Sequence, residues 1–318
     1  MMMTIFQRIF SSRIVAGAIL LVLSCTRPQA ESQRVAEPGQ QFQAYWNAGK
    51  AELARYELRQ ARYGQVHPGE MVVITVTEPF RTDRQVKAES AEGAQHAVNV
   101  LKVQQMRRFA TGIYDYALTT TSFRPFAAQP AAVLKVTGSA VDWCGHAWLQ
   151  LNRRKDSFAV ESRSYFENPG DMEYSVSAAL SEDEIWQRIR TNPAALPVGK
   201  ITVVPSLMSA RLRHRATQVE TARAELQQFA RLKQTEYSLV YGQGQDDERQ
   251  VAFIFESEFP HRVLEYRELY SDVIGGGGKK DKLSTVARLK KTILSPYWQQ
   301  HDLIHKKDRK DFGVRGFD

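Results

Sequence analysis

The stretch MVVITVT, residues 71–77, decides the fold class, because β-branched and apolar side chains fill it almost completely. Branching at Cβ restricts the side chain in a helix and suits the pleated surface of a sheet. The stretch follows His67-Pro68-Gly69, a sequence typical of a turn. An apolar run of this length beside turn residues predicts a β-strand.

Similar runs recur outward from this strand at intervals of roughly ten residues, separated by Gly, Pro, Asn and Asp. We therefore predict a mainly β protein: a large antiparallel meander of roughly 12–15 strands that forms an open curled sheet or a partial barrel. No internal repeat indicates a propeller or solenoid. The further predicted strands lie in residues 111–122, 132–141, 147–151, 157–166, 251–255 and 262–270.

One or two helices should pack against this sheet. Ser181 and Glu184 have the spacing of a capping box, and Pro193 ends the predicted helix. Its apolar face carries Ile185, Trp186 and Ile189. Residues 216–234 fit a helix or a long strand. Residues 51–63 pose the same choice, and we favour a strand because Tyr63-Gly64 and His67-Pro68-Gly69 then form a loop into the next strand.

The N-terminus has the pattern of a secretion signal. A basic leader precedes the apolar run IVAGAILLVL, residues 14–23, which is too short to span a bilayer comfortably. The run ends at Cys25 in a sequence that resembles the bacterial lipobox, with Val22 where leucine is usual. We expect cleavage after residue 24 and lipid on Cys25. An uncleaved helical anchor and an ordinary secretory signal are the alternatives.

The remaining chain divides into three predicted parts. Residues 25–41 are polar and form a flexible tether. Residues 42–300 form the β-meander domain, in which Gly275–Gly278 make a flexible loop. Residues 301–318 form a basic, disordered tail; attraction of this tail to anionic lipid headgroups is the alternative.

Composition narrows the functional classes. The 318 residues carry a formal net charge of +8, and 43% are hydrophobic, which is ordinary for a soluble globular body. The chain has two cysteines, so lipid on Cys25 would leave Cys144 alone and exclude a disulfide framework. An exported protein is not expected to bind nucleic acid.

Several motifs together resemble an uncharacterised family of bacterial envelope lipoproteins whose members often carry the label "septum formation inhibitor Maf". The resemblance covers nearly all of the chain after Cys25. True Maf proteins are cytoplasmic nucleotide pyrophosphatases with an S-x-S-P-R-R type motif near the N-terminus; this chain has no such motif, so the label implies no activity here. The motifs are residues 45–52 (YWNAGKAE), 60–64 (QARYG), 85–87 (QVK), 142–146 (DWCGH) and 165–167 (YFE).

The strongest candidate for chemistry is Asp142, Cys144 and His146. Residues two apart on a strand share a face, so His146 could lower the pKa of the Cys144 thiol while Asp142 orients the imidazole. The competing interpretation is a buried, inert cysteine beside a hydrogen-bonded histidine. We expect no cofactor and no metal site, although His301 and His305 are four residues apart.

Two acidic clusters have structural interpretations. Residues 182–184 (EDE) lie at the predicted helix N-terminus, where negative charge suits the helix dipole, and residues 246–248 (DDE) suit a hairpin loop. There is no G-x-S-x-G elbow.

These features predict a lipid-anchored, non-enzymatic binding, carrier or scaffold protein of the cell envelope. It would be held to the outer or inner membrane through Cys25, with its body facing the periplasm or the cell surface. Its partner would be an envelope protein, a glycan or a lipid. The alternative is a Cys-dependent hydrolase or transferase that uses Cys144 and His146. A lipid carrier would need an apolar cavity on the order of several hundred Å³ on the concave face of the sheet.

Overall fold

The fold is mainly β, as the sequence predicts. In the computed structural model, residues 39–126, 132–167, 170–271 and 282–315 are described, and they form one sheet of 16 strands. The strands are β1 (Ala51–Arg62), β2 (Gln65–Arg81), β3 (Val86–Lys87), β4 (Ala97–Thr111), β5 (Tyr114–Pro125), β6 (Lys135–Asp142), β7 (Gly145–Arg153), β8 (Ser157–Ser164), β9 (Met172–Ser177), β10 (Leu180–Ser181), β11 (Gly199–Val204), β12 (Glu220–Phe229), β13 (Gln234–Tyr241), β14 (Arg249–Glu256), β15 (Val263–Ser271) and β16 (Lys282–Ser295).

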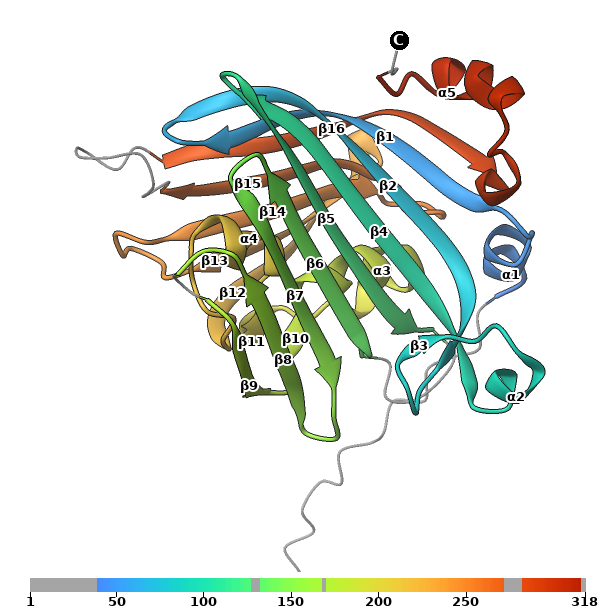
Figure 1. The fold of residues 1–318 in the computed structure, drawn as a ribbon, viewed down its shortest axis with the longest axis horizontal. Helices are drawn as coiled ribbons and strands as arrows, with labels where there is room; N and C mark the ends of the chain where they lie inside the picture. The colour runs from blue at the N-terminus through green and yellow to red at the C-terminus, as the bar shows by residue number, and fades with distance from the viewer. Residues whose placement is uncertain (1–38, 127–131, 168–169, 272–281, 316–318) are drawn as a thin grey trace, which may run out of the picture. The chain divides into compact units, whose positions relative to one another are not determined.

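Two meanders make up the sheet. The strands from β1 to β9 pair in chain order, apart from β3, and so do the strands from β10 to β16. All pairs are antiparallel except β10 with β11. The meanders join where β1 pairs with β16, with Ala51 opposite Ser295. Figure 1 shows an unclosed sheet that curls until its two halves face each other.

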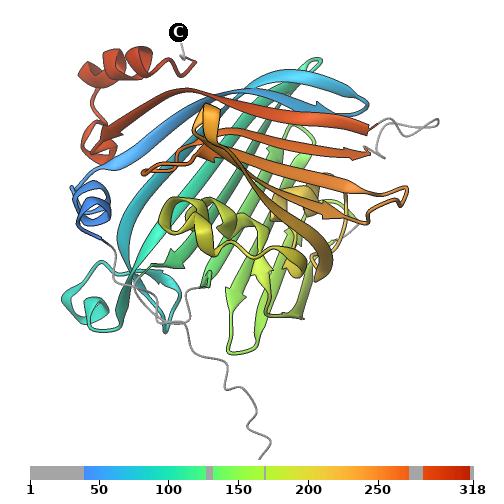
Figure 2. The same cartoon turned by 180° about the vertical axis from the view of Figure 1, so that it is seen from behind.

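Short helical segments fill the space between these halves, as both views show (Figures 1 and 2). Trp186 in α3 (Ile185–Thr191) stands edge-on to Tyr56 of β1 and Phe253 of β14, so one ring contacts both meanders. The helix α4 (Leu207–Leu212) packs on β6, where a Cβ at Gly138 would come within 2.7 Å of Met208 Cε. The concave face is therefore part of the hydrophobic core.

The other helical segments are short. These segments are α1 (Gln40–Trp46), α2 (Ala91–Ala94) and α5 (Lys306–Phe312), with 3-10 turns at Glu182–Glu184, Pro193–Ala195, Ala230–Leu232, Tyr297–Gln299 and Leu303–His305. The helix α1 packs Phe42 and Trp46 against Leu101 and Phe126.

Most local predictions are confirmed. Residues 71–77 lie inside β2, residues 51–62 form β1, and residues 220–229 form strand β12 instead of a helix. The helix before Pro193 is present, but its predicted capping box is wrong. Ser181 makes no side-chain cap hydrogen bond, and the carboxylate of Glu184 accepts from the backbone N–H of Val133 instead.

Two predicted boundaries are wrong. The tether prediction overlaps α1, which begins at Gln40. The disordered tail is also incorrect for residues 301–315, since Phe312 is buried against Ala51, Val72 and Ile74. Cys25 and Gly275–Gly278 lie outside the described residues.

Candidate functional site

The predicted Asp142, Cys144 and His146 site does not form on one strand. Asp142 ends β6 and Gly145 begins β7, so Trp143 and Cys144 make the turn between them. The carboxylate of Asp142 accepts hydrogen bonds from the backbone N–H groups of Cys144, at 2.7 Å, and Gly145, at 3.2 Å. Its role is thus to stabilise a tight turn.

The thiol and the imidazole have separate surroundings. Cys144 is exposed, so the prediction of a buried cysteine is wrong. His146 Nε2 lies 2.9 Å from Ser139 Oγ, with which it shares a hydrogen bond. Within the described part of the chain, no hydrogen bond joins His146 to Cys144. Cys144 and His146 therefore do not form the hydrogen-bonded thiol–imidazole pair that the sequence suggested.

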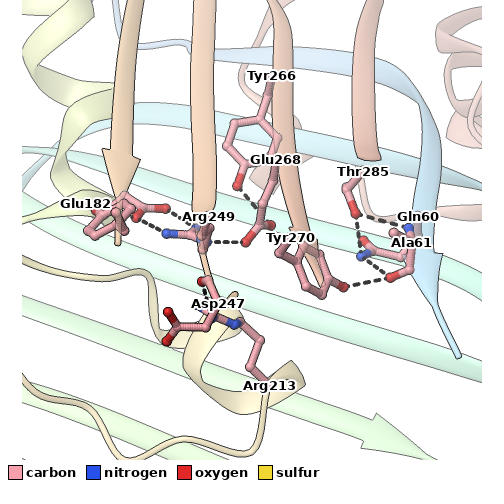
Figure 3. Close-up of polar contacts among 11 residues, drawn as sticks. Gln60, Ala61, Glu182, Arg213, Asp247, Arg249, Tyr266, Glu268, Tyr270 and Thr285 are labelled. Carbon is pink, nitrogen blue, oxygen red and sulfur yellow. Dashed lines mark hydrogen bonds and ion pairs between the residues drawn. The ribbon is translucent and has the colours of Figure 1, made fainter. Parts of the chain in front are cut away.

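The acidic residues 182–184 have a larger role than their sequence suggested. All three are buried, and the carboxylate of Glu182 accepts two hydrogen bonds from Arg249 of β14, with Nη1 to Oε2 at 2.6 Å and Nη2 to Oε1 at 2.7 Å. Arg249 Nε donates to Glu268 of β15 at 2.7 Å. Tyr241 OH donates to Glu182 as well (2.7 Å). Figure 3 shows this chain of contacts from the helical segment to the sheet.

Asp183 and Glu184 make separate connections. Asp183 Oδ2 accepts from the backbone N–H of Leu207 at 3.0 Å, which caps the start of α4. Burial raises the pKa of Asp183 to about 6. Glu184 accepts from the backbone N–H of Val133 (2.7 Å) and pairs with Arg188 at 3.2 Å.

A third ionic cluster lies where α3 meets the start of β1. Both guanidinium Nη atoms of Arg190 lie 2.6 Å from the Glu52 carboxylate. Tyr45 also donates to Glu52, and Arg190 lies over the Trp46 ring at 5.0 Å. Although burial opposes ionisation, Arg190 together with the Tyr45 hydrogen bond holds the pKa of Glu52 below its usual value.

The buried charges at Glu182, Arg249, Glu268, Glu52 and Arg190 fix the helical segments in place. Each of these carboxylates forms an ion pair with a guanidinium group. Such paired charges favour a structural role over acid–base chemistry. The hollows that α4 lines hold about 10 Å³ each. On the concave face, side chains of the helical segments, including Trp186, Leu207 and Met208, pack into the main hydrophobic core.

The hollow with an apolar floor lies instead on the convex face, beneath the C-terminal segment. We call it the C-terminal groove. Its volume is about 660 Å³. The outward side chains of β1, β2, β4 and β16 form the floor, and residues 297–314 form the opposite wall. The apolar lining residues are Leu53, Val72, Ile74, Met106, Ile293, Tyr297, Leu303, Phe312 and Val314.

Three contacts hold the wall of this groove against the sheet. Phe312 is only 6% exposed on the apolar floor. Lys291 Nζ donates to the carbonyl oxygen of Asp311, at 2.5 Å. The backbone N–H of Arg315 donates to Glu70 Oε2 at 3.2 Å. Polar groups at the rim come from Arg108, His301, His305, Lys306 and Arg309. The carboxylates of Glu70, Asp302 and Asp308 also line it, so the groove combines an apolar floor with a rim of mixed charge.

A second large hollow, of about 1370 Å³, lies over β11, β12 and β13. Most of its lining side chains are polar, including Lys200, Arg223 and Glu225. Arg223 and Glu225 form an exposed ion pair at 2.9 Å. This hollow lacks the apolar floor typical of a small-molecule site.

The remaining predicted metal and loop residues do not assemble a site. His301 pairs with Asp302 at 3.3 Å, and His305 ends a 3-10 turn. Among the described residues, no three metal-ligating side chains gather together. Residues 246–248 occupy the loop between β13 and β14, as predicted, where Asp247 pairs with Arg215 (3.0 Å).

The groove could not have been located from the sequence, since its floor and its wall come from distant segments. The sequence signals for an ordered C-terminal segment were Phe312, an apolar residue in a basic stretch, and the glycine that follows it. Gly313 has φ 83°, the left-handed conformation that commonly ends a helix.

Comparison with the models of known protein families and with curated proteins finds no match. Among solved structures, the chain is similar to a β-barrel-like protein of a domain of unknown function, DUF1849, from Brucella abortus. The two share 10% sequence identity with a TM-score of 0.44, over 77% of this chain and 98% of that chain. This likeness is too weak to carry an argument about function. No helix in the described ranges is long and apolar enough to cross a membrane.

Proposed function

We propose that this protein is a lipid-anchored, non-enzymatic binding protein of the cell envelope, and that the C-terminal groove holds an apolar chain. The groove carries the proposal. Its volume of about 660 Å³ lies within the usual range of ligand pockets, roughly 300–1,000 Å³. An apolar floor removes a hydrocarbon from water, which is the dominant favourable term in binding such a ligand.

The rim indicates which end of the ligand stays outside. Lys306 and Arg309 lie along the wall, and Arg108 lies on the neighbouring strand β4. These cations lie among the carboxylates of Asp302 and Asp308, and we assign to the cations the role of binding a negatively charged head of the ligand. A long-chain fatty acid has both properties and is our reference ligand.

The anchor in this proposal comes from the sequence. The apolar run before Cys25 and the polar residues after it have the arrangement of a lipoprotein signal and tether. Lipid on Cys25 would hold the groove near a membrane, which is a source of hydrocarbon chains.

The binding test uses a fluorescent fatty acid and the full-length protein. Met106→Trp places a bulky indole ring on the groove floor and should weaken binding by about tenfold, which corresponds to roughly 1.4 kcal/mol. Thr221→Trp places the same ring in the polar hollow over β12 and should leave affinity unchanged. Circular dichroism establishes that both variants are folded. Saturable binding that Met106→Trp and a second filling variant, Ile293→Trp, leave intact would refute the groove as the site.

The anchor test uses metabolic labelling with palmitate in cells that make the full chain. We expect Cys25→Ser to abolish labelling, while Cys144→Ser, which changes the other cysteine, retains it. Labelling that survives Cys25→Ser would remove the anchor from the proposal and leave the groove to be judged by ligand binding alone.

A further inference from the structure

The C-terminal segment that forms the wall of the groove, together with the end of β16, exposes large apolar side chains to solvent. Leu303 is 80% exposed and Ile304 is 72% exposed. Trp298 and Leu294, close to them in the chain, are 46% and 41% exposed. We call these four residues the C-terminal ridge. A group of exposed large apolar side chains in one short segment marks an interaction surface.

Basic residues follow the ridge directly. Lys306, Lys307 and Lys310 belong to α5, and no ion pair is recorded for any of them among the described residues. Apolar side chains beside lysines are the combination by which peripheral helices hold a membrane surface, since the apolar groups enter the interface and the amines meet anionic headgroups.

The folded body also begins at this end of the sheet. Leu294 of the ridge pairs with Glu52 of β1, six residues after α1 ends at Trp46. Both views show α1 and the C-terminal segment at the same edge of the sheet (Figures 1 and 2). The first helix of the described body therefore lies at the same edge of the sheet as the C-terminal segment.

We propose that the C-terminal ridge rests on the surface of an anionic lipid bilayer. This inference relies on the proposed anchor at Cys25 and adds an orientation to it. In that orientation the bilayer lies against the segment that forms the wall of the C-terminal groove, so a hydrocarbon chain would pass between bilayer and groove past this wall.

The opposite end of the strands supplies a matched control. Ile113 is 83% exposed in the turn between β4 and β5. Leu294 is level with Val103 of β4, through its pairing with Glu52 and then Thr75. From Val103 to Thr111 the strand extends about 25–30 Å at 3.3 Å per residue. A bilayer that contacts the ridge should therefore not contact Ile113.

The experiment uses full-length protein isolated from membranes and reconstituted in vesicles, in a Cys144→Ser background. A single thiol is introduced by Ile304→Cys or by Ile113→Cys and labelled with an environment-sensitive dye. Vesicles contain phosphatidylcholine alone or with phosphatidylglycerol, and some carry a lipid quencher in their acyl chains. Flotation reports anchoring separately, and labelling of the Cys144→Ser protein without an introduced thiol reports whether Cys25 is blocked.

We expect the quencher to reach the dye at position 304 in anionic vesicles and not at position 113. Changing Lys306, Lys307 or Lys310 to glutamine should lower the docked fraction. Each change should reduce the ratio of docked to undocked protein by about fivefold. Protein that floats with vesicles but is quenched at neither position, or at position 113 only, would overturn the inference. Equal quenching in neutral vesicles would overturn its anionic part. A concentration-dependent dye shift without vesicles would assign the ridge to a second copy of the chain.

Discussion

Arg249 and Glu182 form a two-hydrogen-bond ion pair between strand β14 and the turn that precedes α3, although 67 residues separate them in the chain. Both side chains are almost completely buried. Arg249 also pairs with Glu268, so these contacts connect the helical segments inside the curled sheet to the C-terminal half of the sheet (Figure 3).

Arg249→Met should destabilise the protein by about 3–5 kcal/mol, because it leaves two buried carboxylates without their cation. The free energy of unfolding in urea measures this loss. Arg223→Met removes an exposed ion pair with Glu225 and should cost less than about 1 kcal/mol. A double change, Arg249→Met with Glu182→Leu, should recover part of the loss. An effect of Arg249→Met as small as that of Arg223→Met would show that the buried pair is dispensable.

Asp183 should make stability depend on pH in a direction opposite to that of a paired acid. Burial raises its pKa to about 6 from the ordinary aspartate value of 3.8. The folded state therefore binds more protons than the unfolded state between these values. Its contribution is fully present below about pH 4 and is lost as pH rises through 6, by about 2–3 kcal/mol.

The measurement is the difference in unfolding free energy between the wild type and Asp183→Asn from pH 4 to pH 7. We expect the variant to gain on the wild type as pH rises. A constant difference across this range would contradict the raised pKa of Asp183.

Phe312 should control access to the C-terminal groove. Phe312→Ala removes the main apolar contact of the wall and should speed tryptic cleavage at Lys306, Lys307 and Lys310, because detachment exposes the backbone. Leu303→Ala changes a side chain that is 80% exposed and should leave the cleavage rate unchanged. Equal rates for the two variants would mean that Phe312 does not hold the wall.

The Cys144 thiol should react without help from His146. The imidazole is hydrogen-bonded to Ser139, so His146→Ala should leave the rate of alkylation by iodoacetamide near neutral pH within about twofold of the wild type. Mass spectrometry of the Cys144 peptide measures the rate. Slowing by tenfold or more in His146→Ala would revive the cysteine-dependent enzyme as an alternative.

Local sequence was sufficient for the strands and insufficient for the sites. Residues 71–77 predict a strand because β-branching acts within each residue. The turn at Asp142 was also signalled, since Asp at its first position and Gly145 at its fourth are typical of a type I turn. The alternation of Asp142, Cys144 and His146 predicts a shared strand face instead, and this is wrong because the chain turns between β6 and β7.

Long-range contacts account for what the sequence did not reveal. The cation that neutralises Glu182 comes from β14, and the partner of Glu52 comes from α3. Charge periodicity along the chain contains no information about such partners. For the same reason, the basic composition of residues 301–318 predicted disorder, whereas the burial of Phe312 on the sheet orders the segment through residue 315.

The pairing of β1 with β16 has a consequence for the order of folding. Within each meander, strands that are neighbours in the chain pair with each other, so these contacts can form locally. The pairing of β1 with β16, which we call the central seam, instead joins Ala51 to Ser295. Contacts between such distant residues form slowly, because a long loop must close before they are made. Until then, two long strands, β1 and β16, present unpaired backbone edges that can pair with other chains. The last step of folding is therefore the step most exposed to aggregation, and a chaperone that covers either edge would act at this seam.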